Sequence, residues 1–134
     1  MFGSKRLYAS LIKEDDLEEL YEIYISNKDY LQLTERISDG IGVYTKEQML
    51  RDFQVAEWMG RKTLGIYMRD NMKLIGVLEY MERAVDGNPW IGLIMIHNQY
   101  QSQGYGSEFL KSFLCWAQHQ GWNEIRAVVI TIEL

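Results

Sequence analysis

Residues 94–110 read IMIHNQYQSQGYGSEFL, and this stretch decides the fold that the sequence predicts. An apolar run, a polar segment with two glycines and an amphipathic helical pattern follow one another. A strand, a glycine loop and a helix in this order suit an anion, because the first turn of a helix presents unpaired N–H groups and positive potential. Gly104 and Gly106 permit close approach of the backbone. Gln101 and Ser107 can add side-chain donors.

The loop differs from two better-known phosphate-binding motifs. The dinucleotide-binding fingerprint requires a third glycine and an acidic residue after the next strand, and the P-loop requires a lysine. Neither requirement is met. A loop with two glycines can also be only a tight turn between a strand and a helix, so both interpretations remain open at this point.

Strands and one helix are expected on either side of the loop. Three runs with a period of two precede it, and Asp70–Asn71 predicts a hairpin between the first two. Along the third run, strict alternation places Ile91 on the same face as Leu93 and Met95. The expected strands span residues 63–68, 73–81, 90–97 and 125–132, and the helix after the loop packs through Tyr105, Phe109, Leu110, Phe113, Leu114 and Ala117.

The N-terminal third predicts one strand and two helices. Residues 5–13 alternate weakly, residues 15–27 have helical spacing, and a polar connection follows over residues 27–44. Thr45–Gln48 has the spacing of a capping box, and the helix that it begins ends near Gly60. The packed face of the first helix is expected to contain Leu17, Leu20, Tyr21, Tyr24 and Ile25.

The element order is therefore β-α-α-β-β-β-α-β, which predicts an α/β fold with a mixed sheet and helices on both faces. With 134 residues, 47% of them hydrophobic, the chain is expected to form a single domain over residues 1–134. The net charge of −5 without a Lys/Arg cluster disfavours nucleic-acid and anionic-membrane partners, and it suits a cationic amine. With Cys115 as the only cysteine and no long apolar stretch, we expect a cytoplasmic protein.

Gln101-x-x-Gly104-x-Gly106 matches the signature Arg/Gln-x-x-Gly-x-Gly/Ala of the GNAT superfamily of N-acetyltransferases, which the chain resembles. The surrounding residues look most like the branch that contains ribosomal-protein N-terminal acetyltransferases. The resemblance implies a GNAT-like acyl-CoA N-acyltransferase fold with acetyl-CoA as cosubstrate. The strand before the loop would pair with the pantetheine arm, and the loop amides would bind the pyrophosphate. The implied cofactor-binding residues are Ile94, Met95, Ile96, Gln101, Ser102, Gln103, Gly104, Tyr105, Gly106 and Ser107.

The resemblance further implies direct attack of a neutral amine on the thioester, without a covalent enzyme intermediate and without a metal. Such a reaction needs a base for the amine proton. His97 is the first candidate, because it ends the strand beside the implied thioester channel and imidazole titrates near neutral pH. Glu79 and Glu82 are the other two candidates. Each has a purely structural alternative: a hydrogen bond at a strand end for the histidine, and a solvent-facing or ion-paired position for the carboxylates.

The chain departs from the family pattern after the last predicted strand. The family normally continues with a helix and two strands, which usually supply a tyrosine acid and an asparagine that contacts the cofactor, and neither has a match here. We therefore expect a C-terminally short domain whose open last strand is covered in a homodimer. An acyl-CoA-binding protein without turnover stays an alternative to an active acetyltransferase. An interaction module, with no affinity for coenzyme A, is a third.

Overall fold

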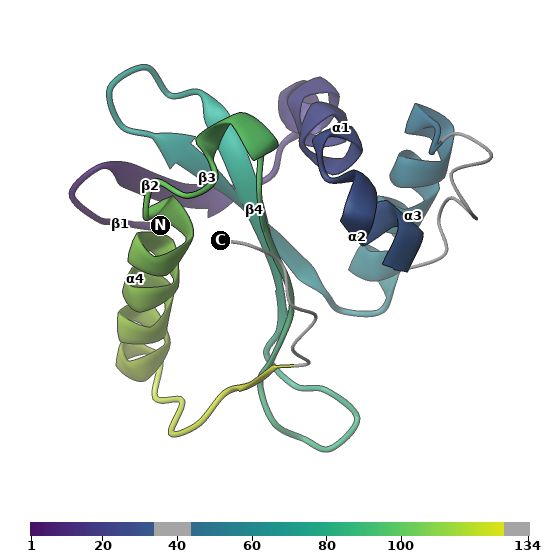
Figure 1. Ribbon diagram of the computed structural model, residues 1–134. Helices are drawn as coiled ribbons and strands as arrows, with labels where there is room; N and C mark the ends of the chain where they lie inside the picture. The colour runs from purple at the N-terminus through teal and green to yellow at the C-terminus, as the bar shows by residue number, and fades with distance from the viewer. Residues whose placement is uncertain (34–43, 128–134) are drawn as a thin grey trace.

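The computed structural model describes residues 1–33 and 44–127 (Figure 1). Within these ranges six strands form one sheet in the order β1-β2-β3-β4-β5-β6, with antiparallel neighbours except for the parallel pair β5–β6. The strands are β1 (Phe2–Gly3), β2 (Leu7–Leu11), β3 (Lys62–Met68), β4 (Leu74–Met81), β5 (Trp90–Ile96) and β6 (Arg126–Ala127). The helices are η1 (Glu14–Asp16), α1 (Leu17–Ser26), α2 (Lys28–Leu33), α3 (Lys46–Trp58), η2 (Asn98–Tyr100) and α4 (Tyr105–His119).

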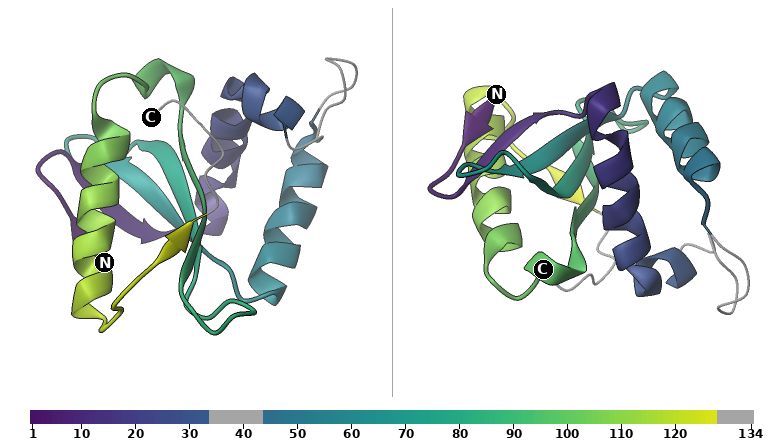
Figure 2. Two further views of the ribbon diagram at one scale, coloured as in Figure 1. Left: turned by 60° about the horizontal axis from the view of Figure 1, so that its bottom comes forward. Right: turned by 90° about the horizontal axis from the view of Figure 1, so that it is seen from above.

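Helices cover both faces of the sheet, as the sequence predicts. Figure 1 shows α4 on one side of the strands and α1, α2 and α3 on the other, and Figure 2 shows the same layers from two further directions. Each face buries its own apolar cluster, because side chains of a strand alternate between the faces. The mixed α/β architecture of the prediction is therefore confirmed.

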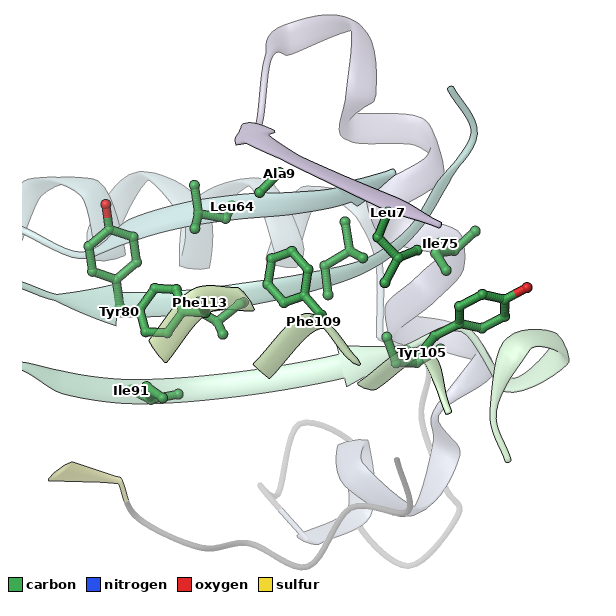
Figure 3. Close-up of a cluster of buried hydrophobic side chains, with 12 residues drawn as sticks. Leu7, Ala9, Leu64, Ile75, Tyr80, Ile91, Tyr105, Phe109 and Phe113 are labelled. Carbon is green, nitrogen blue, oxygen red and sulfur yellow. The ribbon is translucent and has the colours of Figure 1, made fainter. Parts of the chain in front are cut away.

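The α4 side of the sheet holds an aromatic core (Figure 3). Tyr105, Phe109 and Phe113 follow one another at every fourth position and point from α4 onto the strands, so one stripe of the helix is buried. The sequence pattern places Leu114 on this stripe, but its side chain is 39% exposed. It lies about 100° around the helix from its neighbour Phe113, which turns it away from the sheet.

The other face is covered by α1 and by the capping-box helix α3. Thr45 and Gln48 exchange the two predicted capping bonds, which confirms the start of α3. In α1, Ile23 packs against the sheet, whereas Ile25, which the helical pattern places there, is 38% exposed. The polar connection expected over residues 27–44 contains helix α2, and residues 34–43 lie outside the described part of the chain.

Strand β5 contains a bulge that the alternation argument did not predict. The Cα partners are Glu79 with Leu93 and Tyr80 with Ile91, so Gly92 is an extra residue in β5. The extra residue reverses the alternation. Ile91 packs in the α4 cluster and Leu93 in the cluster beneath α1, so the prediction that they share a face is wrong.

The last predicted strand is described only at its beginning. β6 pairs in parallel with the start of β5 through Arg126 and Ala127. Residues 128–132, which the sequence assigns to the rest of this strand, lie outside the described residues. The homodimer contact expected along that strand falls in the same part of the chain.

Candidate active site

The start of α4 has backbone amide groups for which the described residues provide no acceptor. Gly104 is the residue before the helix and has φ +84°, a left-handed conformation that favours glycine. The first bond into the helix runs from the Glu108 N–H to the Gly104 carbonyl at 3.0 Å. Among the described residues no acceptor is found for the N–H groups of Tyr105, Gly106 and Ser107. This helix start is therefore competent to bind an anion.

The loop before α4 is fastened to the end of α1. The side chain of Gln101 donates to Asn27 Oδ1 at 2.8 Å and to the Ile96 carbonyl at 2.9 Å. Asn27 is buried and donates in turn to the carbonyls of Ile23 and Ile96. Gln101, which the sequence suggested as a donor to the anion, therefore uses its amide hydrogens to hold the loop. Ser102 has φ +61°, which is costly for a residue other than glycine, so the loop needs such fastening.

Sequence reasoning missed three residues that hold this loop. They are Asn27, Arg6 and Glu108. Arg6 and Glu108 are 102 positions apart in the chain and meet at the first turn of α4, where the Arg6 Nε lies 2.7 Å from Glu108 Oε1. No local pattern could have revealed this pair, because contacts of such long range depend on how the helix docks on the sheet.

The strand that leads into the loop keeps one edge free within the described residues. Met95 and Ile96 are fully buried, and Ile94 is partly buried. On one side β5 pairs with β4 along its length, whereas described pairing with β6 involves only Trp90 and Ile91. The backbone over residues 94–96 thus has a strand partner on one side. On the other side the Ile96 carbonyl accepts from Asn27 and Gln101, and an extended ligand could pair with the backbone groups before it.

A small acidic cavity lies between α1, α3 and β4, with a volume of about 40 Å³. The Glu79 side chain reaches it from β4 and is 15% exposed. Glu79 Oε1 accepts a 3.0 Å hydrogen bond from the Tyr24 hydroxyl, and Oε2 lies 3.9 Å from an Arg61 nitrogen. At the rim, the Tyr44 hydroxyl donates to Asp52 at 2.9 Å. Two carboxylates, two tyrosine hydroxyls and the Arg61 guanidinium therefore line one small space, in which the carboxylates outnumber the cation.

The cavity adjoins the bulge of β5. Glu79 is paired with Leu93, directly beside Gly92. Among the described residues, a Cβ placed on Gly92 would come within 4 Å of the Glu79 carbonyl oxygen alone, at 3.9 Å. Burial, and next the charge of Glu79, raise the pKa of Tyr24 far above its ordinary value. Tyr24 is therefore a neutral donor that orients the carboxylate across the whole physiological pH range.

The sequence matches the family model described as Acetyltransferase (GNAT) domain over residues 6–132. The chain belongs to this acetyltransferase family. No curated protein matches it in sequence. The family membership agrees with the strand, loop and helix described above, and with the observed element order.

Solved structures resemble this GNAT domain in fold. An acetyltransferase from Thermus thermophilus superimposes with a TM-score of 0.72 at 19% identity, covering 97% of this chain and 80% of the other. A GNAT-family acetyltransferase from Bacillus anthracis superimposes with a TM-score of 0.70 at 22% identity, covering 95% of this chain and 72% of the other. The PaiA N-acetyltransferase of Thermoplasma acidophilum was solved in complex with coenzyme A. It superimposes with a TM-score of 0.61 at 18% identity, covering 95% of this chain and 81% of the other. At these identities the likeness shows the shared fold.

His97 of the GNAT domain lies away from the acidic cavity, in a hollow of about 600 Å³ beside α1 and the β3–β4 turn. Its Nδ1 accepts a 3.1 Å hydrogen bond from the Gln99 N–H. Burial lowers the pKa of His97, with Glu22 opposing and Lys73 adding to the effect. The ring is therefore neutral near pH 7, with its proton on Nε2, and it faces the hollow as a donor.

Glu82 lies outside the cavity and adds no catalytic group to it. It is exposed, follows the end of β4 and pairs with Lys62 at 2.7 Å. Among the described residues, no group of three His, Cys, Asp or Glu side chains could hold a metal ion. No helix in that part of the GNAT domain is long and apolar enough to cross a membrane.

Proposed function

We propose that the chain transfers the acetyl group of acetyl-coenzyme A to a terminal primary amine, which attacks the thioester directly. One observation carries the proposal: the carboxylate of Glu79 stands in a small cavity beside the bulge of the strand that leads into the anion-binding loop. The proposed binding site for the acetyl donor and the proposed base for the acceptor amine therefore both lie beside β5.

The described residues fit coenzyme A as the donor. A pyrophosphate needs several N–H donors without bulky side chains, and the start of α4 provides the amides of Tyr105, Gly106 and Ser107 behind Gly104. The pantetheine arm carries amide groups that can pair with extended backbone, and β5 has no described strand partner beside Ile94 and Met95 on the side away from β4. The similar PaiA structure contains coenzyme A, which supports the same donor here.

The acceptor is inferred from the volume and charge of the cavity. A space of about 40 Å³ is a few times the roughly 10–15 Å³ that a single water needs, so it admits an ammonium group and a short part of the chain that carries it. Glu79 and Asp52 would attract a cation there. A terminal amine on an unbranched end fits, and the remainder of the substrate would lie outside the rim.

Glu79 is the base in this proposal. The amine must lose a proton before or during its attack, and a carboxylate in a small cavity can accept it directly or through one water. The new C–N bond forms at the thioester carbon as the C–S bond breaks, and the leaving thiolate takes up a proton. The Tyr24 hydroxyl keeps Glu79 Oε1 in place. His97 is disfavoured as base, because its Nδ1 is already used by Gln99 and its Nε2 carries the proton.

Titration of acetyl-coenzyme A into the protein, followed by calorimetry, tests the donor site. Gly104→Val adds a branched side chain to the loop and should abolish binding. Gly87→Val is the matched control, because Gly87 has a similar φ of +81° in a turn where an added Cβ meets nothing within 4 Å. If the intact protein does not bind, or if both variants lose affinity equally, the donor site is wrong.

A second candidate function is binding of acyl-coenzyme A without turnover. The small volume of the acceptor cavity favours it, because most amine substrates would have to widen the space. Release of free coenzyme A thiol in a screen of primary amines separates the two candidates. Thiol release that depends on a particular amine supports the transferase, whereas binding without any release supports the second candidate.

We also propose that the chain is a homodimer in which a second copy covers β6, the edge strand of the described sheet. Light scattering on purified protein measures the mass directly. A mass near twice 15.8 kDa at micromolar concentration supports the dimer, and a monomer at that concentration contradicts it.

A further inference from the structure

The loop between β1 and β2 reaches across to the proposed coenzyme site. The Arg6 side chain donates from Nε to Glu108 Oε1 at 2.7 Å, and its backbone N–H donates to Glu108 Oε2 at 3.0 Å. Both terminal nitrogens of Arg6 lie 3.3 Å from the Gln103 carbonyl, and the guanidinium stands 4.2 Å above the centre of the Tyr105 ring. Ser4 donates its hydroxyl to Glu108. One arginine therefore contacts both the loop and the first turn of α4.

Glu108 creates an electrostatic difficulty for an anion site. Its carboxylate lies in the first turn of the helix whose amides would hold the pyrophosphate, so it would compete for the same positive potential and repel the ligand. Burial favours the neutral acid, yet hydrogen bonds from Ser4 and Arg6 outweigh burial and lower the pKa of Glu108. The residue is therefore an anion at neutral pH, and the adjoining guanidinium offsets its charge.

Arg6 also fixes the direction of one peptide group. In a trans peptide the C=O and the following N–H point in opposite directions. Because the Gln103 carbonyl points at Arg6, the Gly104 N–H points away from Arg6. The contact thus decides which side of the loop presents the amide.

We propose that Arg6 is a positioning residue of the coenzyme site, which offsets the charge of Glu108 and orients the Gln103–Gly104 peptide toward the pyrophosphate. This inference rests on the proposed function, because it assumes that coenzyme A binds at the start of α4. Arg6 itself need not touch the ligand. Its effect on affinity passes through Glu108 and the loop.

Four variants separate the effect of the Arg6 charge from the effect of the hydrogen bonds by which Arg6 holds the loop. Arg6→Gln should weaken coenzyme A binding about tenfold, the effect expected of one uncompensated charge at a helix end. Arg6→Gln combined with Glu108→Gln should regain a good part of the affinity, because the repelling carboxylate is then absent. Arg6→Lys should bind coenzyme A with an affinity between those of wild type and Arg6→Gln. Lysine retains the positive charge, but it lacks the planar guanidinium that bonds to Glu108 and Gln103 at the same time. Glu108→Gln alone should bind coenzyme A more tightly than Arg6→Gln, because it removes the repelling charge and leaves the Arg6 guanidinium at the Gln103 carbonyl.

Calorimetry with coenzyme A gives each dissociation constant, and pantetheine, which lacks the pyrophosphate, serves as the second probe. Thermal melting establishes that each variant folds. If Arg6→Gln does not fold, the affinity of Arg6→Lys is compared with that of wild type instead. Unchanged affinity in Arg6→Gln, equal losses in the single and double variants, or an equal loss for pantetheine would overturn the inference. Absence of coenzyme A binding to the wild-type protein would instead overturn the proposed function, and this inference with it.

Discussion

The loop before α4 and the cavity beneath α1 are built from different parts of the protein. The loop offers backbone amides, and the side chains of Arg6 and Gln101 serve to hold that backbone in place. The cavity offers side chains, among them Glu79 and Asp52, from separate elements. A site made of backbone is sensitive to how the chain is held, whereas a site made of side chains is sensitive to which residues are present. Substitutions in the two regions should therefore change different quantities.

The largest effect is expected at the base. Glu79→Gln keeps the size of the side chain and removes its ability to accept the amine proton, so kcat should fall about 10²- to 10⁴-fold. Binding of acetyl-coenzyme A should stay within about twofold, because the donor site is made of backbone. Steady-state kinetics and calorimetry measure the two quantities.

Glu82→Gln is the matched control for the base. Glu82 lies three residues further along, is exposed and pairs with Lys62, so its loss should leave kcat unchanged. Equal kcat values for wild type and Glu79→Gln would show that another group removes the proton.

Asn27 connects the two regions and should affect both. Asn27→Ala removes one donor each from the carbonyls of Ile23 and Ile96 and one acceptor from the Gln101 amide, which should lower the free energy of unfolding by about 1–3 kcal/mol. It should also weaken coenzyme binding, because the loop loses its fastening to α1. Thermal melting and calorimetry measure these effects. The same change at the exposed Asn123 should alter neither, and full coenzyme affinity in Asn27→Ala would mean that the loop holds itself.

A smaller effect is expected at the cavity rim. Asp52→Asn removes a partly solvated negative charge, so KM for the amine should rise about two- to fivefold while kcat changes little. Glu47→Gln, on the same helix and away from the cavity, should leave KM as it is. If Asp52→Asn lowers kcat as strongly as Glu79→Gln does, the assignment of Glu79 as the only base in the cavity is wrong.

The smallest effect concerns acid stability. The pKa of Glu108 is lowered from 4.5 in the folded protein, so the folded state binds this proton less readily than the unfolded state. The stabilisation from Glu108 is therefore complete above the unfolded value and is lost as pH falls through the folded value. Between about pH 5 and about pH 3, the melting temperature of Glu108→Gln should fall less than that of wild type. Parallel melting curves over this range would show that Glu108 contributes nothing to acid sensitivity.

Much of the strand and helix pattern could be predicted from the sequence, because each element depends on its own residues. The capping box of Thr45–Gln48 and the loop over residues 101–107 are local signals of this kind, and the former is confirmed in the structure. The side on which Ile91 lies could not be predicted, because the bulge at Gly92 arises from how β5 pairs with β4. The α2 helix was missed because six residues give little periodicity.

The same difference applies to the candidate site. The glycine signature predicts where a pyrophosphate would bind, since the necessary amides follow one another in the chain. Glu79 was a candidate from its place on a strand, but its contact with Tyr24 crosses 55 positions and gives no sequence signal. Arg6 and Glu108, separated by 102 positions, were invisible for the same reason.

The long reach from the β1–β2 loop to α4 has a consequence for how quickly the protein folds. From β1 to β5 every strand pairs with its neighbour in sequence; the β1–β2, β3–β4 and β4–β5 pairs join short stretches of chain, whereas β2 and β3 pair across the helices between them. The Arg6–Glu108 contact and the packing of Phe2 on Phe109 close a loop of about a hundred residues, which is slow and comes after those contacts. The coenzyme site is thus completed late. Stopped-flow measurements on Arg6→Gln should show faster unfolding and an unchanged folding rate.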